Sequence, residues 1–152
     1  MTNSPVCRAE HINHIGIAVK DIDSTLEFYK TMFGAISSGI EDIEDQGVKA
    51  ALVRVGASQL EFIQPTDENG GVARFIESRG ETVHHICFEV DDLPGKLDKL
   101  DNEGVRLIDK APREGLSGMI GFIHPSSTAG ILYELVDRNT CLLYTSPSPR
   151  DS

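Results

Sequence analysis

The sequence predicts an α+β fold in which two βαβββ modules, one after the other, form a single domain. The segments HIGIAVKDI at 14–22 and HICFEVDDL at 85–93 each place a histidine before an alternating apolar run and an acidic step. A period of two is typical of a half-buried strand. Each segment continues into a helical pattern and then into short apolar runs, and 152 residues are enough for one such domain.

In the first module, which covers 11–68, a helix is expected directly after the first strand. Ser24 and Glu27 have the spacing of a capping box, and Gly34 suits the end of the helix. The apolar stripe of this helix consists of Leu26, Tyr29 and Phe33, and the strands that follow it are expected at 48–56 and 59–64. A short helix at 72–80 is expected to link the modules.

The second module covers 83–137 and repeats the plan of the first. Asp92 is the expected N-cap, Pro94 fits the first helical turn because its missing N–H would be unpaired there anyway, and Gly104 suits the end of the helix. Its apolar stripe consists of Leu93, Leu97 and Leu100, and its later strands are expected at about 105–109, 119–124 and 131–136.

The two termini lie outside the predicted domain. Residues 1–10 form an N-terminal extension that lacks the apolar core of a secretory signal. The C-terminal string CLLYTSPSPRDS at 141–152 has no amphipathic period and resembles the translation of a sequencing adapter. We interpret it as a non-native tail, so that Cys141 carries no meaning.

Charge and cysteine usage exclude several classes of function. A net charge of −10 disfavours nucleic acid and anionic membrane surfaces, because neutralising phosphates needs a basic face. No apolar run is long enough to span a bilayer. The three cysteines form no CxxC pair, which indicates a reducing, cytoplasmic setting.

A histidine and a glutamate recur at matching places in the two modules. Glu61 lies forty-seven residues after His14, and Glu134 lies forty-nine residues after His85. Each glutamate interrupts an apolar strand, where a buried carboxylate is costly unless something pairs with it. A histidine alone in a strand is more often structural, but the repeated pair predicts one shared site.

The four residues predict a divalent metal centre. Two imidazoles and two carboxylates suit Co(II), Mn(II), Ni(II), Zn(II) or Fe(II), and they leave two positions open for a substrate, as in catalytic sites. Strand alternation places His84 on the opposite face from His85, so we expect His84, like His11, to be structural. Cys87 shares the face of His85, and we expect it to be a small buried apolar residue.

The sequence resembles the vicinal oxygen chelate superfamily, which includes glyoxalase I and extradiol dioxygenases. From about residue 11 to 137 it is similar to the methylmalonyl-CoA epimerase family. The resemblance is carried by NHIGIAV (13–19), DQGVKAAL (45–52), LEFIQP (60–65), HHICFEVDD (84–92) and FIHPSSTAGILYEL (122–135). The strand motifs fit many superfamily members, whereas the Gln-Gly-Val and His-Pro-Ser-Ser stretches are more specific.

The resemblance implies a cytoplasmic metal-dependent isomerase, often a cobalt enzyme and often a homodimer, that acts on a small-molecule acyl-CoA. It would interconvert (2R)- and (2S)-methylmalonyl-CoA through an enolate. Glu134 would be one acid/base group, and the other would be a glutamate just before Gln-Gly-Val, where this sequence has Asp45 after Glu44. Either carboxylate could serve, or 41–45 could be a solvated acidic loop.

The expected substrate contacts lie in the same motifs and in the glycine-rich stretch at 113–121. They are Gln46, Gly118, His124 and Ser126, with Lys110 and Arg113 as the nearest cations for the CoA phosphates. Plain turn chemistry is the alternative for the His-Pro-Ser-Ser turn.

Two other functions remain open. One is another metal-dependent enzyme on this scaffold, such as a glyoxalase-like lyase or isomerase, or a dioxygenase. The other is a metal-free ligand-binding or resistance protein, which would have no need for two carboxylates opposite two imidazoles.

Overall fold

The computed structural model describes residues 4–140, which form two compact units. The first unit is His14–Ile86, and the second combines the chain up to Asn13 with the chain from Cys87 onward. Strands β1 (His11–Ala18) and β5 (Val83–Val90) each continue from one unit into the other. The proposed tail at 141–152, with Cys141, lies outside the described residues.

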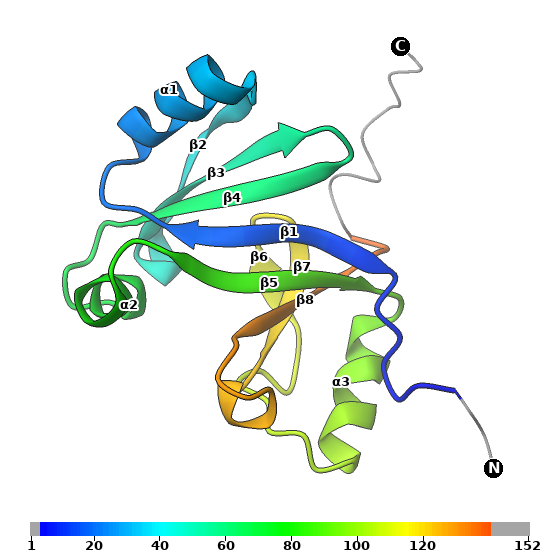
Figure 1. Ribbon diagram of the computed structural model, residues 1–152. Helices are drawn as coiled ribbons and strands as arrows, with labels where there is room; N and C mark the ends of the chain where they lie inside the picture. The colour runs from blue at the N-terminus through cyan, green and yellow to red at the C-terminus, as the bar shows by residue number, and fades with distance from the viewer. Residues whose placement is uncertain (1–3, 141–152) are drawn as a thin grey trace. The chain divides into compact units, whose positions relative to one another are not determined.

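In the first unit the strands follow the order β2-β3-β4-β1-β5 across the sheet. β2 (Ser37–Ile43), β3 (Val48–Val55) and β4 (Ser58–Pro65) are antiparallel neighbours, whereas β1 and β4 run parallel. Helix α1 (Ile22–Phe33) lies against β3 and β4, and helix α2 (Gly71–Arg79) lies against β4 (Figure 1). The predicted linking helix is thereby confirmed.

The core of the first unit forms between α1 and the sheet. Ile22, Val53 and Phe62 are fully buried there, and the ring of Tyr29 lies 4.7 Å from that of Phe62. Burying side chains of this size contributes roughly 1.5–3 kcal/mol each. This core supports the strands that carry the candidate site.

The expected capping box of α1 is wrong. The N-cap is Asp21, whose carboxylate accepts the backbone N–H of Ser24 at 3.2 Å, so Ser24 and Glu27 lie within the helix. The aspartate reaches the free N–H groups of the first turn and starts the helix three residues early. Gly34 is confirmed as the C-cap, with the left-handed φ of 68° that favours glycine.

Strand β2 has no counterpart among the expected strands. Its sequence, SSGIEDI, lacks apolar alternation because the strand lies at the edge of the sheet and its residues are exposed or only half-buried. It completes the βαβββ order of the first module. The segment 41–45 is therefore the end of a strand and the start of a short 3-10 helix, η1 (Glu44–Gln46), rather than a loop.

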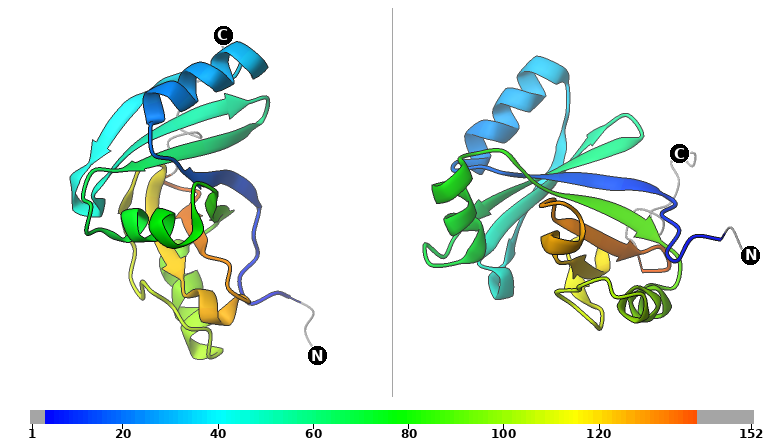
Figure 2. Two further views of the ribbon diagram at one scale, coloured as in Figure 1. Left: turned by 60° about the vertical axis from the view of Figure 1, so that its left-hand side comes forward. Right: turned by 60° about the horizontal axis from the view of Figure 1, so that its bottom comes forward.

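The second unit contains β8 (Tyr133–Asp137), β7 (Gly118–Ile123) and β6 (Arg113–Gly115) in this order, with the end of β5 bonded to the end of β8. Helix α3 (Leu93–Asn102) lies against β7 and β8 (Figure 2). Its predicted cap is confirmed, because Asp92 accepts the N–H of Gly95. The predicted stripe is confirmed too, since Leu93, Leu97 and Leu100 are all buried.

The strand expected at 105–109 is wrong. Only Leu107 forms an isolated bridge, to Ile123, and the first strand after α3 is β6 at 113–115, inside the glycine-rich stretch where substrate contacts are expected. Val105, Leu107 and Ile108 give this segment a strand-like composition, but Asp109 accepts the backbone N–H of Phe122 and redirects the chain.

The helices of the described chain are short. α1, α2 and α3 contain 12, 9 and 10 residues, and the 3-10 helix η2 (Pro125–Ser127) follows β7. Within residues 4–140, no helix is long and apolar enough to cross a membrane.

Candidate metal centre

The candidate site begins with a glycine on β1. The parallel register pairs Gly16 with Glu61 of β4, so both face the same side of the sheet, and alternation puts His14 on that side too. Because Gly16 has no side chain, the surface above it is open to residues from neighbouring strands. Glycine inside a strand often marks such a close approach.

The imidazole of His85, from β5, fills the space above Gly16. A Cβ placed on Gly16 would overlap three atoms of that ring, namely Cε1, Nδ1 and Nε2. His14, Glu61 and His85 are all buried, with 1%, 7% and 4% of their surface exposed. Three adjacent strands of the first unit therefore contribute one side chain each to a single buried spot.

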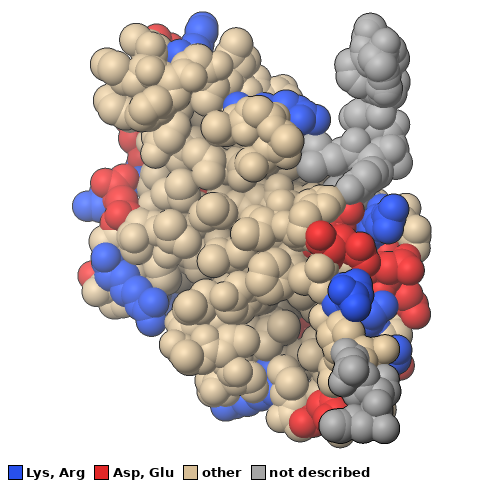
Figure 3. Space-filling view, turned by 45° about the vertical axis from the view of Figure 1, so that its right-hand side comes forward, with Lys and Arg blue, Asp and Glu red and all other residues tan. Residues whose placement is uncertain are grey.

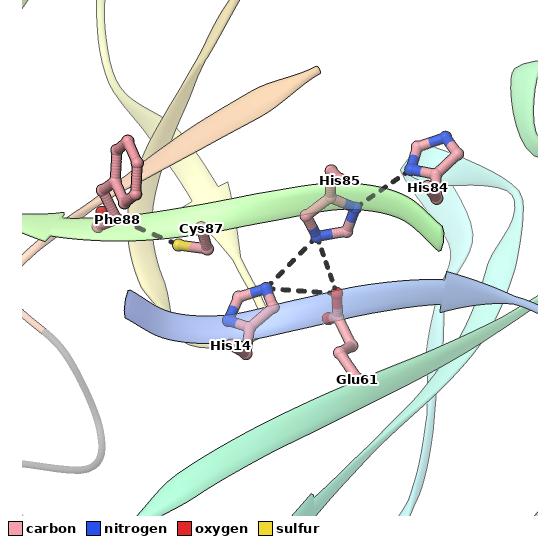
Figure 4. A network of polar contacts seen from close by, with 6 residues as sticks. All are labelled: His14, Glu61, His84, His85, Cys87 and Phe88. Atoms are coloured by element: carbon pink, nitrogen blue, oxygen red, sulfur yellow. Dashed lines mark hydrogen bonds and ion pairs between the residues drawn. The ribbon is translucent and has the colours of Figure 1, made fainter. Parts of the chain in front are cut away.

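The donor atoms of these three side chains converge (Figure 4). Nε2 of His14 lies 3.2 Å from Nε2 of His85, and Oε1 of Glu61 lies 3.4 Å and 3.2 Å from these two atoms. The two rings are nearly perpendicular, at 88°. Two imidazole nitrogens at this distance can both donate their lone pairs to one ion that lies next to both of them.

The triangle of donors fits a divalent ion. Metal–ligand distances of about 2.0–2.1 Å separate neighbouring donors by about 3.0 Å in an octahedron and by about 3.4 Å in a tetrahedron. The three observed separations, 3.2, 3.2 and 3.4 Å, lie in this range. Two imidazoles and a carboxylate are also the ligand types preferred by Co(II), Zn(II), Ni(II) and Fe(II).

The carboxyl group of Glu61 is held ionised. Burial raises its pKa, but the charge and hydrogen bond of His14, together with those of His85, more than offset this and lower the pKa from 4.5 to about 2. A carboxyl that keeps its charge is ready to act as a metal ligand.

Glu134 occupies the corresponding place in the second unit. It lies on β8, pairs with Phe122 of β7 in the strand register, and is only 6% exposed. It therefore resembles Glu61 in being a buried carboxylate within an apolar strand. The prediction of buried carboxylates at both positions is confirmed.

The structure corrects one prediction about the other histidines and supports another. His84 does not simply point away from the site, because its Nδ1 lies 2.9 Å from Nδ1 of His85. Alternation separates neighbouring side chains, but Nδ1 is close enough to the backbone for the two rings to meet. His11 forms an ion pair with Glu89, consistent with a structural role. Cys87 is fully buried beside Ile120 and Val136, as expected.

The proposed second base lies in η1. Glu44 and Asp45 are exposed, Gln46 is half-buried, and Gly47 ends this turn with a φ of 66°. Within residues 4–140, the side chains of these three residues form no hydrogen bond or ion pair. The choice between Asp45 and Glu44 therefore stays a prediction.

Three of the expected substrate contacts, Gly118, His124 and Ser126, lie in the second unit. His124 caps η2 by accepting the N–H of Ser126 on its Nδ1, at 3.0 Å, and Gly118 begins β7 with a φ of 137°. The two expected cations already have carboxylate partners. Lys110 lies 3.8 Å from Asp101, and Arg113 lies 2.9 Å from Asp109.

Sequence reasoning missed Gly16. The signal was present as a glycine two residues after His14, inside an otherwise apolar strand. The contact between His84 and His85 was missed as well, and period-two alternation gave no signal for it.

Comparison with known proteins agrees with this fold. Residues 13–122 match the Glyoxalase/Bleomycin resistance protein/Dioxygenase superfamily. The chain therefore belongs to this superfamily, and within it to the methylmalonyl-CoA epimerase family.

Three relatives support this placement. The ethylmalonyl-CoA/methylmalonyl-CoA epimerase of Cereibacter sphaeroides is 32% identical over 82% of this chain and 95% of its own. The crystal structure of methylmalonyl-CoA epimerase from Mycobacterium tuberculosis has a TM-score of 0.84 and 33% identity, covering 96% of this chain and 97% of that one. A variant of the Streptomyces coelicolor enzyme in complex with 2-nitronate-propionyl-CoA has a TM-score of 0.82 and 34% identity, covering 92% and 100%.

Proposed function

We propose that the protein is a metal-dependent epimerase that interconverts (2R)- and (2S)-methylmalonyl-CoA. The observation that carries this proposal is the convergence of His14, Glu61 and His85 on one buried spot in a chain whose relatives are named as epimerases of this substrate. The acyl-CoA ligand of the Streptomyces coelicolor relative supports an acyl-CoA substrate here.

His14, Glu61 and His85 would hold a divalent ion, with Glu134 as the fourth ligand. Glu134 is proposed because it is the buried carboxylate at the matching place in the second module. Co(II) is favoured from the family resemblance, and Mn(II), Ni(II), Zn(II) and Fe(II) suit the same ligands. When bound, the ion would act as a Lewis acid on the thioester carbonyl and the carboxylate that flank C2 of the substrate.

Epimerisation needs one acid/base group on each side of C2. We propose that one of the two, Glu134 or Asp45, accepts the C2 proton on a carboxylate oxygen, while the C–H electron pair moves into the enolate. The other carboxyl group then donates a proton to the opposite face of C2. The two groups exchange protonation states, and the substrate keeps its composition.

Asp45 is proposed as the second base, with Glu44 as its alternative. Both lie in η1 and are exposed, which leaves their carboxylates accessible to a ligand. Asp45 is one methylene shorter than glutamate, and an error of about 1 Å in a proton-transfer distance can cost on the order of a hundredfold in rate. The backbone of η1 would have to compensate for this length.

Substrate contacts are proposed for Gln46, Gly118, His124 and Ser126. The half-buried side chains of Gln46 and His124 offer polar atoms, and Gly118 offers a backbone that a ligand can approach closely. The capping bond from Ser126 to His124 would have to coexist with substrate binding or open for it.

A homodimer and a cytoplasmic location belong to the same proposal. The outer face of α1 and the turn after it expose four large apolar side chains, which a second copy would cover; they are Phe28, Met32, Phe33 and Ile36. In Figure 3 the upper part of the molecule is mostly tan, with blue Lys or Arg atoms and a small red area at its top edge and further blue atoms to the right. The free thiol of Cys7 fits a reducing compartment.

Proton exchange tests the activity directly. Metal-free protein is loaded with Co(II) and incubated in D₂O with (2S)-methylmalonyl-CoA, and NMR follows deuterium at C2 and the ratio of epimers. We expect both exchange and formation of the 2R epimer above a control that contains only the metal. Exchange no faster than in that control would contradict the proposal.

A further inference from the structure

His84 lies beside the imidazole of His85, on the side away from the proposed metal. Its Nδ1 lies 2.9 Å from Nδ1 of His85, and the two rings are almost perpendicular, at 89°. The other nitrogen of His85, Nε2, faces His14 and Glu61 (Figure 4). His85 therefore uses its two nitrogens for two different partners.

The ring of His84 is itself held in place. Phe75 of α2 lies edge-on against it, with ring centroids 4.7 Å apart at 70°. The guanidinium of Arg79 lies over the Phe75 ring at 5.5 Å, and His84 is half-buried. Contacts of this kind restrict the rotation of His84 and fix which of its nitrogens points at His85.

The contact between the two Nδ1 atoms sets a condition on the protons. A neutral imidazole carries one N–H donor and one acceptor nitrogen. To bind a metal through Nε2, His85 must carry its proton on Nδ1. That N–H needs an acceptor, and the neutral His84 ring provides one when its own proton lies on Nε2.

We infer that His84 is a positioning residue, which holds the His85 ring in the orientation and tautomer that present Nε2 as a metal ligand. This inference rests on the proposed metal site. A metal-bound histidine commonly donates its other N–H to an acceptor, and loss of that acceptor typically lowers metal affinity by about 10- to 100-fold. Phe75 contributes indirectly, because its ring packs against His84 and restricts the rotation of His84.

Two substitutions separate this role from packing. His84→Asn keeps an acceptor, because the Asn Oδ1 stands as many bonds from the backbone as the histidine Nδ1. His84→Leu keeps a comparable volume but has no acceptor. His11→Leu is the matched control, since it removes a histidine that pairs with Glu89 in the second unit.

Calorimetric titration of the metal-free proteins with Co(II) gives the first measurement. We expect His84→Leu to lower the affinity by about 10- to 100-fold, whereas His84→Asn stays within about threefold of the wild type and His11→Leu is unchanged. Equal affinity of His84→Leu and the wild type would overturn the inference. So would equal losses in His84→Leu and His84→Asn, because an acceptor would then be irrelevant.

Proton NMR of the Co(II)-loaded wild type and of Co(II)-loaded His84→Leu gives a second measurement. The Nδ1–H protons of His14 and His85 should appear as two strongly shifted resonances that vanish in D₂O. We expect one of them to exchange slowly and to broaden selectively in His84→Leu. Rapid exchange of both in the wild type would overturn the inference. Wild-type protein that takes up no cobalt would overturn the metal site itself, and this inference with it.

Discussion

Gly16 and His85 lie so close together that no side chain larger than hydrogen fits between the β1 backbone and the imidazole ring. The glycine thereby determines how deeply the ring of His85 can sit beside His14 and Glu61. Gly16→Ala should displace the ring, destabilise the protein by about 1–3 kcal/mol through overpacking, and weaken Co(II) binding by roughly tenfold or more. Calorimetric titration and thermal unfolding of the metal-free protein measure the two effects.

Gly71→Ala is the matched control for this substitution. Gly71 begins α2, and a Cβ placed there meets nothing within 4 Å. Because alanine favours helix by up to about 1 kcal/mol over glycine, this variant should be as stable as the wild type or more so, with unchanged metal binding. Equal metal affinity of both alanine variants would contradict the role of Gly16.

Removing a proposed ligand should cost both metal and turnover. His85→Ala deletes one of the three convergent donors, and Glu134→Ala deletes the proposed fourth ligand and acid/base group. We expect each to lose C2 exchange and to bind Co(II) at least about tenfold more weakly. Metal content after dialysis and NMR exchange rates measure both. Unchanged affinity in Glu134→Ala would remove that residue from the ligand set.

The lowered pKa of Glu61 predicts a pH dependence of stability in the metal-free protein. A carboxyl whose pKa falls from 4.5 to about 2 on folding stabilises the fold at pH values above 4.5. This contribution is lost as the pH falls from 4.5 toward 2, because the unfolded chain takes up the proton first.

Glu61→Gln has no such carboxyl and provides the comparison. The free energy of unfolding of the wild type, from urea titration with a chelator present, should exceed that of Glu61→Gln at pH 5. About half of the difference should be gone at pH 3. A difference that is the same at both pH values would contradict the lowered pKa.

The second base can be identified from the asymmetry of exchange. If Asp45 serves one face of C2, Asp45→Asn should slow exchange from one epimer by at least about a hundredfold, and the other epimer less. Glu44→Gln should then behave like the wild type. The measurement is the initial rate of deuterium uptake from each pure epimer. The reverse pattern would assign the role to Glu44.

The apolar face of α1 predicts the state of association. Phe33, which is 68% exposed, is the most exposed of its large apolar side chains. Phe33→Glu should convert a dimer into monomers, as measured by analytical ultracentrifugation. Ile108→Glu is the control, because Ile108 is also half-exposed but lies in the second unit. A wild-type monomer, or a Phe33→Glu dimer as tight as the wild type, would contradict this prediction.

The sequence allowed most of the fold to be predicted, because the repeated modules follow clear periodicities. The stripe of α3, the linking helix and the strands that carry His14, Glu61, His85 and Glu134 are where the pattern placed them. The stripe predicted for α1 is wrong at Phe33, which is 68% exposed, whereas Leu26 and Tyr29 pack against the core. β2 was missed because an exposed edge strand needs no apolar alternation. The segment 105–109 was predicted to be a strand because it is rich in apolar residues. Its apolar residues lie in an irregular segment instead, and composition alone does not distinguish such a segment from a strand.

The convergence of the ligands was predictable in kind but not in detail. A buried carboxylate in an apolar strand, repeated with a histidine, left few explanations other than a metal. The close approach of Gly16 to His85 and the contact of His84 with His85 depend on the register of strands distant in sequence. Local pattern carries no information about that register.

The buried triangle of His14, Glu61 and His85 also affects which metal a purified sample of the protein contains. Such donors bind nickel and copper more tightly than manganese or iron, whichever ion the cell supplies. Protein eluted from a nickel resin, or grown in zinc-rich medium, would carry the metal of its preparation. Elemental analysis therefore describes the history of a sample, until the site has been emptied with a chelator and refilled with one ion at a time.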